Sequence, residues 1–282
     1  MNEKLNTHYF ECLWLNDHQF SDRNADFWNL RAEEYNQSVS KDRSVMSREN
    51  KVQYFVEKSL INSESTVLDI GCGSGQLAIA HARVVKKVVA MDFSEKMLGF
   101  AKENAKKAGV DNIQFVLSDW EHFPLEEPFD FVIASMSPAI NSSTGLYKMM
   151  AACRGSCYLS AFVDRYSSLK EKLYKLTDQV YKRQYDIINY VFNILWINGY
   201  LPELTYEMGY YERILTIEKA KESYALDLGV NKIPLKIKLL ETFFDQEKKE
   251  GFIKEIVNQT KGELIWKCSH LKIQKSQSLD DK

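Results

Sequence analysis

The sequence predicts an α/β fold, in which a mostly parallel sheet carries helices on both of its faces. Two observations indicate this class of fold. Short apolar runs alternate with helical patterns through the middle of the chain, and the first run ends in a glycine-rich turn over residues 71–75. Alternation of this kind is typical of parallel sheets with right-handed crossovers, which bring the carboxyl ends of the strands to one edge, where ligands bind.

The N-terminal region is predicted to be helical in patches. Phe27, Leu30, Ala32 and Tyr35 recur at helical spacings, as expected of a helix with one apolar face. The polar stretch 36–50 is predicted to be a loop, and a second helix is expected over about residues 48–60.

Five strands and three helices are predicted in the middle of the chain. The first strand ends at the glycines, as a buried parallel strand would, and the longest helix has Ser94 as its N-cap and Gly109 as its stop. The strands are Thr66–Ile70, Lys87–Met91, Ile113–Leu117, Phe129–Ala134 and Cys157–Phe162, and the helices are Gln76–Val84, Ser94–Ala108 and Thr144–Ala152.

The last third of the chain is less regular. Residues Leu169–Asn198 have a helical pattern, Leu204–Leu215 has β character, and helical patterns are expected again from Thr216 to about Asn258. Glu263–Ile273 is predicted to be the final strand, and we expect the polar tail 274–282 to be disordered.

Composition excludes several classes of protein. The 282 residues suit one elaborated domain, and 45% hydrophobic with 27% charged residues is ordinary for a globular chain. A net charge of −2 gives no electrostatic reason to expect a nucleic acid partner. No apolar run is long enough to span a bilayer, so no membrane partner is expected. The N-terminus has no signal-peptide pattern, so we expect a cytoplasmic protein.

No metal site is expected. The five cysteines are an odd number without a secreted pattern, which favours reduced thiols. Cys153 and Cys157 would share a face of a helix, but no second cysteine or histidine pair follows them in the sequence. The five histidines are scattered without metal spacing, and His122 is interpreted as a loop residue.

The first predicted strand ends in a feature that suits a ligand. Asp69 is followed by Gly71 and Gly73, glycines that allow a tight turn and a close approach of the backbone. The turn leads into a helix N-terminus, which suits an anionic group such as a carboxylate. A purely structural turn remains an alternative, whereas the dinucleotide fingerprint fails because Gln76 stands in place of its third glycine.

The second and third predicted strands also end in candidate binding residues. Asp92 follows the second strand, where an acidic residue can accept hydrogen bonds from both hydroxyls of a ribose, although a helix cap is its alternative role. Asp119 and Trp120 follow the third strand, where they would hold and cover an adenine, or else form a turn beside a core tryptophan.

These three features, in this order at successive strand ends, resemble the class I S-adenosylmethionine-dependent methyltransferases over roughly residues 66–162. The resemblance implies a Rossmann-like sheet of seven strands, the last of them antiparallel, with S-adenosyl-L-methionine as the cofactor. It also implies an N-terminal helical lid or extension over 1–60 and a methyltransferase domain over 61–282, with a helical insertion at about 216–260 before the last strand.

The resemblance assigns the cofactor contacts residue by residue. Tyr35 lies on a helix that resembles the one closing over the cofactor in many small-molecule methyltransferases, although a helix packed on the sheet edge is an equal alternative. Gly75 is assigned a close helix–strand contact, and Cys72 is a small residue of the turn. The assigned cofactor contacts are Tyr35, Asp69, Gly71, Cys72, Gly73, Asp92, Phe93, Met97, Ser118, Asp119, Trp120 and Ser135.

The segment after the fourth strand favours a small-molecule acceptor. In this family it faces the transferring methyl group, and here residues 134–140 lack the acidic or amide residue and the aromatic that amino-directed base methyltransferases carry. The candidate acceptor contacts are Trp28, Met136, Ser137 and Tyr166, and no catalytic base is assigned. An RNA or protein methyltransferase, or a cofactor-binding relative without methyl transfer, remains the alternative.

Overall fold

The structure is a computed structural model that describes residues 6–17, 24–39, 42–230 and 233–268. Its seven strands form one sheet in the order β3-β2-β1-β4-β5-β7-β6, which confirms the predicted α/β fold with a mostly parallel seven-stranded sheet. The strands are β1 Thr66–Ile70, β2 Lys87–Asp92, β3 Ile113–Leu117, β4 Phe129–Ser135, β5 Cys153–Ser167, β6 Glu203–Thr216 and β7 Phe252–Lys267.

Helices connect the strands and precede them. Those of the N-terminal half are α1 Thr7–Leu15, α2 Ala25–Val39, α3 Asp42–Glu57, α4 Gln76–Ala82 and α5 Glu95–Ala108. Those of the C-terminal half are α6 Ser143–Ala151, α7 Ser168–Leu176, α8 Ile187–Ile197, α9 Ile217–Asp227 and α10 Pro234–Glu247. None of these described helices combines the length and apolarity needed to cross a membrane.

The centre of the sheet explains why the first strand is a continuous apolar run. Strand β1 pairs in parallel with β2 and with β4, so that Val67 lies opposite both Val88 and Phe131. A strand flanked on both sides and covered on both faces exposes no side chain to water, and four of the five β1 residues are buried.

The final strand runs antiparallel to β5, as the resemblance implies. Cys268, directly after β7, donates its backbone N–H to Gly155 near the start of β5. Ile256, near the start of β7, donates its N–H to Ser168 Oγ, directly after β5. The beginning of each strand therefore meets the end of the other.

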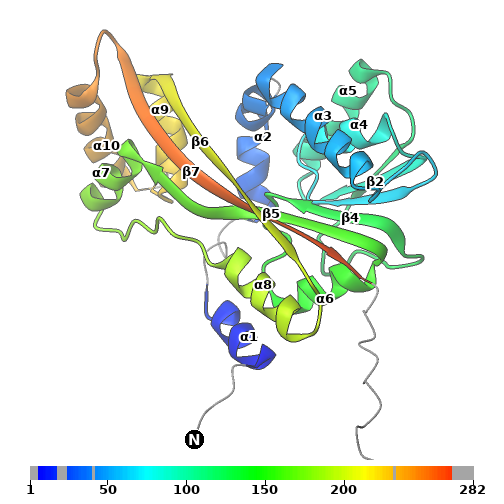
Figure 1. Cartoon of the computed structure of the whole chain (residues 1–282). Helices are drawn as coiled ribbons and strands as arrows, with labels where there is room; N and C mark the ends of the chain where they lie inside the picture. Colours follow the sequence, from blue (N-terminus) through cyan, green and yellow to red (C-terminus); the bar gives the residue numbers. More distant parts are fainter. Residues whose placement is uncertain (1–5, 18–23, 40–41, 231–232, 269–282) are drawn as a thin grey trace, which may run out of the picture. The chain divides into compact units, whose positions relative to one another are not determined.

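The chain divides into two compact units, and the first contains most of the sheet. It comprises Met1–Ala161, Ile187–Thr205 and Glu263–Lys282. Helices α4 and α5 contact β2 and β3, while α1 contacts α6 and α8. Figure 1 shows α3, α4 and α5 on one side of β4, with α6 and α8 on the other.

The core of the first unit is centred on Phe55 of α3. Its ring stacks on the His81 ring at a centroid distance of 5.9 Å and lies 5.0 Å from Phe131 and 5.1 Å from Tyr158. All four side chains are buried, so α3, α4, β4 and β5 are joined by one aromatic cluster. Burial lowers the pKa of His81 to about 4, because desolvation disfavours the imidazolium.

The second unit comprises Phe162–Asp186 and Tyr206–Gly262. Its own core joins α7, α9 and α10 through a set of buried apolar side chains. They are Leu169, Leu173, Ala220, Tyr224, Leu228, Val230, Leu240, Phe244 and Ile253. Beside this core, Glu255 accepts a hydrogen bond from Ser167 Oγ and pairs with Arg213 at 3.3 Å.

Several predicted elements differ from the structure, and one of them is the fifth strand, which was predicted over Cys157–Phe162 but runs over Cys153–Ser167. The loop predicted over 36–50 is wrong, because α2 runs to Val39 and α3 begins at Asp42; residues 40–41 lie outside the described residues. Packing of α2 on α5 and of α3 on α4 overrides the weak periodicity of this polar stretch. The helix predicted over 169–198 is interrupted between Leu176 and Ile187.

The predicted boundary of the last strand is also wrong. Strand β7 begins at Phe252, where a helical pattern was expected, and ends at Lys267. Burial alternates along its first half, and the buried set includes the charged Glu255, which hid the period-2 pattern in the sequence. The tail predicted over 274–282 lies outside the described residues.

Candidate functional site

The turn after β1 has the backbone geometry that the glycines were expected to provide. Gly71, Gly73 and Gly75 have φ angles of 70°, 55° and 80°, which side chains rarely allow. A Cβ atom added to Gly71 would lie 2.0 Å from Ser137 Oγ. Glycine at 71 is therefore required by the backbone and by the close approach of the segment after β4.

The other two glycines each have a neighbour that also restricts a side chain. A Cβ atom on Gly73 would lie 3.2 Å from Cε1 of the Tyr35 ring, so the phenol of α2 covers this part of the turn. A Cβ atom on Gly75 would lie 2.9 Å from Cβ of Ala101, which brings the start of α4 close to α5. The turn is thus packed between α2 and α5.

Asp92, at the end of β2, holds the glycine turn in place. Its Oδ2 accepts the backbone N–H of Gly73 and its Oδ1 accepts the N–H of Ser94, both at 2.8 Å. Burial raises the pKa of Asp92, while these backbone hydrogen bonds lower it. A carboxylate has about four acceptor positions, so Asp92 keeps capacity for hydroxyl donors of a ligand.

Asp69 is a buried carboxylate with an unused oxygen. The residue is 2% exposed, and its Oδ2 has no hydrogen-bond partner among the described residues. Burial, with a smaller contribution from the charge of Asp92, raises the pKa of Asp69 to about 7. An unpaired oxygen of this kind favours a cationic or hydrogen-bond-donating ligand, which would stabilise the ionised carboxylate.

Helix α2 is fastened over the turn near both of its ends. Asn29 Oδ1 accepts hydrogen bonds from Ser94 Oγ at 2.7 Å and from the Lys96 N–H at 3.2 Å. About two turns further along α2, Asn36 Oδ1 accepts a hydrogen bond from the side-chain amide of Asn104. The same amide also donates to the Ser74 carbonyl at 2.9 Å. These amides fix α2 against α5 and against the glycine turn.

Two aromatic residues of α2 lie at the site. The rings of Trp28 and Tyr35 form an edge contact at a centroid distance of 6.1 Å. Burial raises the pKa of the Tyr35 phenol, and the charges of Asp92 and Asp69 add to this, against an opposing effect of Arg48. The buried indole N–H of Trp28 has no acceptor among the described residues.

The segment after β4 has a strained backbone. Met136 has φ 53°, which is uncommon for a residue with a side chain and is found preferentially at functional sites. Its N–H donates to the Ser160 carbonyl at 2.9 Å, and Ser135 Oγ lies 3.1 Å from Ser160 Oγ. Ser137 Oγ accepts from the Ala139 N–H at 3.2 Å, so this segment is held next to Gly71.

The end of β3 differs from the arrangement that the sequence suggested for adenine. Trp120 is only 4% exposed, and its indole N–H donates to the Gly145 carbonyl at 2.9 Å, as in the core tryptophan alternative. Asp119 Oδ1 accepts from the His122 N–H at 2.8 Å and lies 2.7 Å from His122 Nδ1. These hydrogen bonds lower the pKa of Asp119.

The remaining predicted residues are placed as follows. Ser118 donates its N–H to the Asp92 carbonyl at 3.1 Å and so joins the ends of β2 and β3. Phe93, the residue after Asp92, is half-buried. Met97 is buried in the first turn of α5, and burial raises the pKa of the Cys72 thiol. Tyr166 belongs to the second unit, where the Arg183 guanidinium lies 5.4 Å from its ring centroid.

Several residues of this site escaped the sequence analysis. Asn29, Asn104 and Ser160 make the contacts that fasten α2 and the segment after β4. Ser160 had a usable signal, because it is a hydroxyl residue within a buried apolar strand. The two asparagines had none, since exposed-looking amides on a helix are ordinary without knowledge of what packs against them.

Comparisons with known proteins define the class of protein that this fold and turn represent. A model of a family described as a methyltransferase domain matches residues 61–278. A proposed methyltransferase of Bacillus halodurans C-125 has a similar fold, with a TM-score of 0.50 and 18% identity over 78% of this chain and 99% of that one.

Curated relatives match a shorter part of the chain. The ribosomal protein L11 methyltransferase of Thermotoga maritima is 35% identical over 94 residues, 32% of this chain and 34% of that protein. The protein-L-isoaspartate O-methyltransferase of Methanoculleus marisnigri is 36% identical over 91 residues, 32% and 41% of the two chains. The chain thus spans about a third of the length of the curated relatives it matches. It belongs to the methyltransferase-domain family, and S-adenosylmethionine is the cofactor that the resemblance of the sequence implies.

The residues present suit this cofactor. S-adenosylmethionine carries a positive sulfonium and an ammonium group, and the site offers two buried carboxylates, one of which has an unpaired oxygen. The glycine turn would admit a ligand close to the backbone, and the capacity left on Asp92 suits ribose hydroxyls.

Proposed function

We propose that this protein transfers a methyl group from S-adenosylmethionine to a small-molecule acceptor. The observation that carries the proposal is the fastening of α2 over the glycine turn, with Tyr35 against Gly73 and Asn29 bonded to Ser94. A helix of the same chain covering this turn leaves less room for a polymer than for a metabolite. The net charge of −2 also gives no support to a polyanionic acceptor.

The residues of the site have distinct proposed roles. Asp92 would accept hydrogen bonds from the ribose hydroxyls while it holds Gly73, and Asp69 would compensate positive charge on the methionine part. Tyr35 and Trp28 would exclude water and position the acceptor, together with Met136 and Ser137 after β4. Phe93, Met97 and Ser118 would border the adenosine. Asp119 and Trp120, at the end of β3, would border it after a rearrangement of that strand end on binding.

S-adenosylmethionine supplies an already activated methyl group, so the protein's contribution is chiefly alignment and exclusion of water. Well-oriented reactants can gain about 7–11 kcal/mol of barrier reduction from positioning alone. We therefore assign no catalytic base.

The experiment is a transfer assay with S-adenosylmethionine labelled in its methyl group. The full chain is incubated separately with a metabolite ultrafiltrate, with RNA and with protein from the same cell extract. Label in the ultrafiltrate, lost in Asp92→Ala and kept in the exposed control Asp111→Ala, supports the proposal. Label only in RNA or protein would assign a macromolecular acceptor, and binding of the cofactor without transfer to any fraction would indicate a relative that does not methylate.

The alternative acceptors have support from relatives, not from this site. A 23S rRNA (uracil(1939)-C(5))-methyltransferase of Aliivibrio salmonicida is 29% identical over 131 residues. The names of the Thermotoga maritima and Methanoculleus marisnigri relatives refer to protein acceptors, ribosomal protein L11 and protein L-isoaspartate. A cytoplasmic location also remains part of the proposal.

A further inference from the structure

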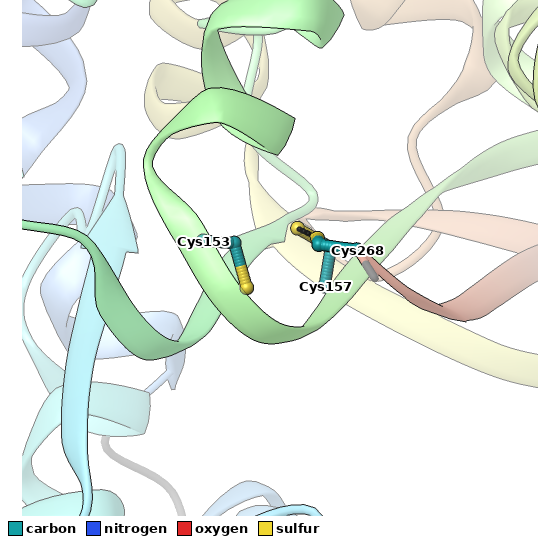
Figure 2. A group of neighbouring side chains, drawn as sticks. All are labelled: Cys153, Cys157 and Cys268. Atoms are coloured by element: carbon teal, nitrogen blue, oxygen red, sulfur yellow. Dashed lines mark hydrogen bonds between the residues drawn. The ribbon is translucent and has the colours of Figure 1, made fainter. Parts of the chain in front are cut away.

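Three cysteines that are distant in the sequence meet in the first unit. Cys153 and Cys157 lie at the start of β5, and Cys268 directly follows β7. The sulfur atoms of the three lie within 4.8 Å of one another, and those of Cys157 and Cys268 are 3.2 Å apart (Figure 2). In the sequence, only Cys153 and Cys157 lie near each other, and for that reason no metal site was predicted.

The backbone fixes this arrangement. Cys268 donates its N–H to the Gly155 carbonyl at 2.9 Å, so the end of β7 is held between the two cysteines of β5. Cys153 and Cys157 are buried, and Cys268 is partly exposed, which leaves one side from which an ion can enter. The cluster is thus pre-formed by strand pairing and needs no long-range rearrangement.

We propose that Cys153, Cys157 and Cys268 form a binding site for a thiophilic divalent cation, with Zn²⁺ as the ion of choice. Zinc–sulfur bonds of about 2.3 Å in tetrahedral geometry place ligand sulfurs about 3.8 Å apart. The observed separations, from 3.2 Å up to the 4.8 Å limit, bracket that value. Small side-chain shifts are therefore enough, and water from the exposed side of Cys268 completes the coordination.

The site is separate from the cofactor turn. Cys153 lies opposite Phe129, at the start of β4, whereas Ser135 and the segment next to Gly71 lie at the other end of that strand. Because the strands are parallel, Cys153 lies at the end of the sheet opposite to the cofactor turn, and Cys157 lies opposite Val132, three residues before Ser135 along β4. A metal here would stabilise the attachment of β7 to β5 rather than take part in methyl transfer.

Metal binding requires the loss of protons. In the free protein the Cys153 sulfur lies 3.1 Å from the Ser156 carbonyl oxygen, and the Cys157 sulfur lies 3.8 Å from the Met149 carbonyl oxygen. Thiolates, not thiols, are the ligands, so binding would release the thiol protons to the buffer and would weaken as the pH falls. No oxidant is involved.

The test uses the full chain, reduced and freed of metal with a chelator, and titrated with Zn²⁺ by calorimetry. Cd²⁺ is added in parallel to follow the ultraviolet absorption of metal–thiolate bonds. We expect one equivalent of either ion, with the charge-transfer band, and at least about tenfold weaker binding in Cys268→Ser and Cys157→Ser. Cys12→Ser, a cysteine on α1 away from the cluster, should bind as the native chain does.

Several outcomes would overturn the proposal. These are the absence of Zn²⁺ binding by the reduced chain, or binding by Cys268→Ser and Cys157→Ser that equals that of the native chain. Far-ultraviolet circular dichroism of each variant confirms folding. The readout does not depend on methyl transfer, so it can succeed or fail independently of the proposed function.

Discussion

The backbone N–H of Gly73 donates to Asp92 Oδ2 over 2.8 Å, so the carboxylate at the end of β2 holds the turn that follows β1. The same carboxylate is the proposed ribose acceptor. Asp92→Ala should therefore lose both the brace of the turn and the contact with the ligand. We expect S-adenosylhomocysteine affinity, measured by calorimetry, to fall by about 2–3 kcal/mol or more, because two buried donors lose a charged acceptor. Unchanged affinity would show that the end of β2 does not contact the ligand.

Asp69 predicts a pH dependence of cofactor binding. Its pKa of about 7 is raised by burial, and a cationic ligand would favour the ionised form. Affinity for S-adenosylmethionine should therefore rise with pH through about 7 in the native chain and be lower and flat in Asp69→Asn. Binding isotherms between pH 6 and pH 8 check this; a parallel rise in the variant would assign the dependence to another group.

The same carboxyl also affects stability. Because its folded pKa of about 7 exceeds the ordinary 3.8, the folded state binds more protons between these values, and the free energy of unfolding falls as the pH rises through this window. Asp69→Asn cannot titrate, so it should be more stable than the native chain at pH 8, by at most about 4 kcal/mol. Urea denaturation without ligand at pH 4.5 and pH 8 measures the difference; a loss of stability at pH 8 would contradict it.

The lowered pKa of His81 predicts a change of stability with pH that is opposite in sign to that of Asp69. Its folded pKa of about 4 lies below the ordinary 6.5, so the folded state binds fewer protons and stability is lost as the pH falls from about 6.5 to about 4. His81→Leu should flatten this part of the stability curve, whereas His8→Leu, on the exposed surface of α1, should retain it. Equal acid sensitivity of both variants would remove His81 as the cause.

Gly71→Ala separates backbone strain from steric overlap. The new Cβ would lie 2.0 Å from Ser137 Oγ, and φ is 70°. Gly109, with φ 68° and open space around it, supplies the control in which strain acts alone, and Gly109→Ala should cost about 1–2 kcal/mol. We expect Gly71→Ala to lose more than this in thermal unfolding, and Ser137→Gly to restore part of the loss when the two are combined. No restoration would show that Ser137 is not the obstacle.

The sequence predicted the centre of the fold well because burial there leaves a simple pattern. Strands β1 and β3 were predicted with their observed bounds, and β2 and β4 within one residue at the end, since each is a short apolar run closed by polar or glycine residues. Strand β7 was mistaken at its start because the buried Glu255 depends on Ser167 and Arg213, which no local pattern reveals.

The candidate site was predictable in part for the same reason. Asp69 and Asp92 lie at the carboxyl ends of β1 and β2, and the glycines follow β1, so the parallel topology brings them together. Asn29 and Cys268 contribute through contacts made by packing of distant segments, with Ser94 in one case and Cys157 in the other. Sequence periodicity carries no information about such partners.

The two amide anchors of α2 have a kinetic consequence. Asn29 and Asn36 bind side chains or amides of α5, so a ligand seated on the glycine turn beneath Tyr35 would leave only when these local bonds open. Residence time would then follow the opening equilibrium of one helix rather than the unfolding of the unit. Low concentrations of denaturant should accelerate release before they unfold the sheet.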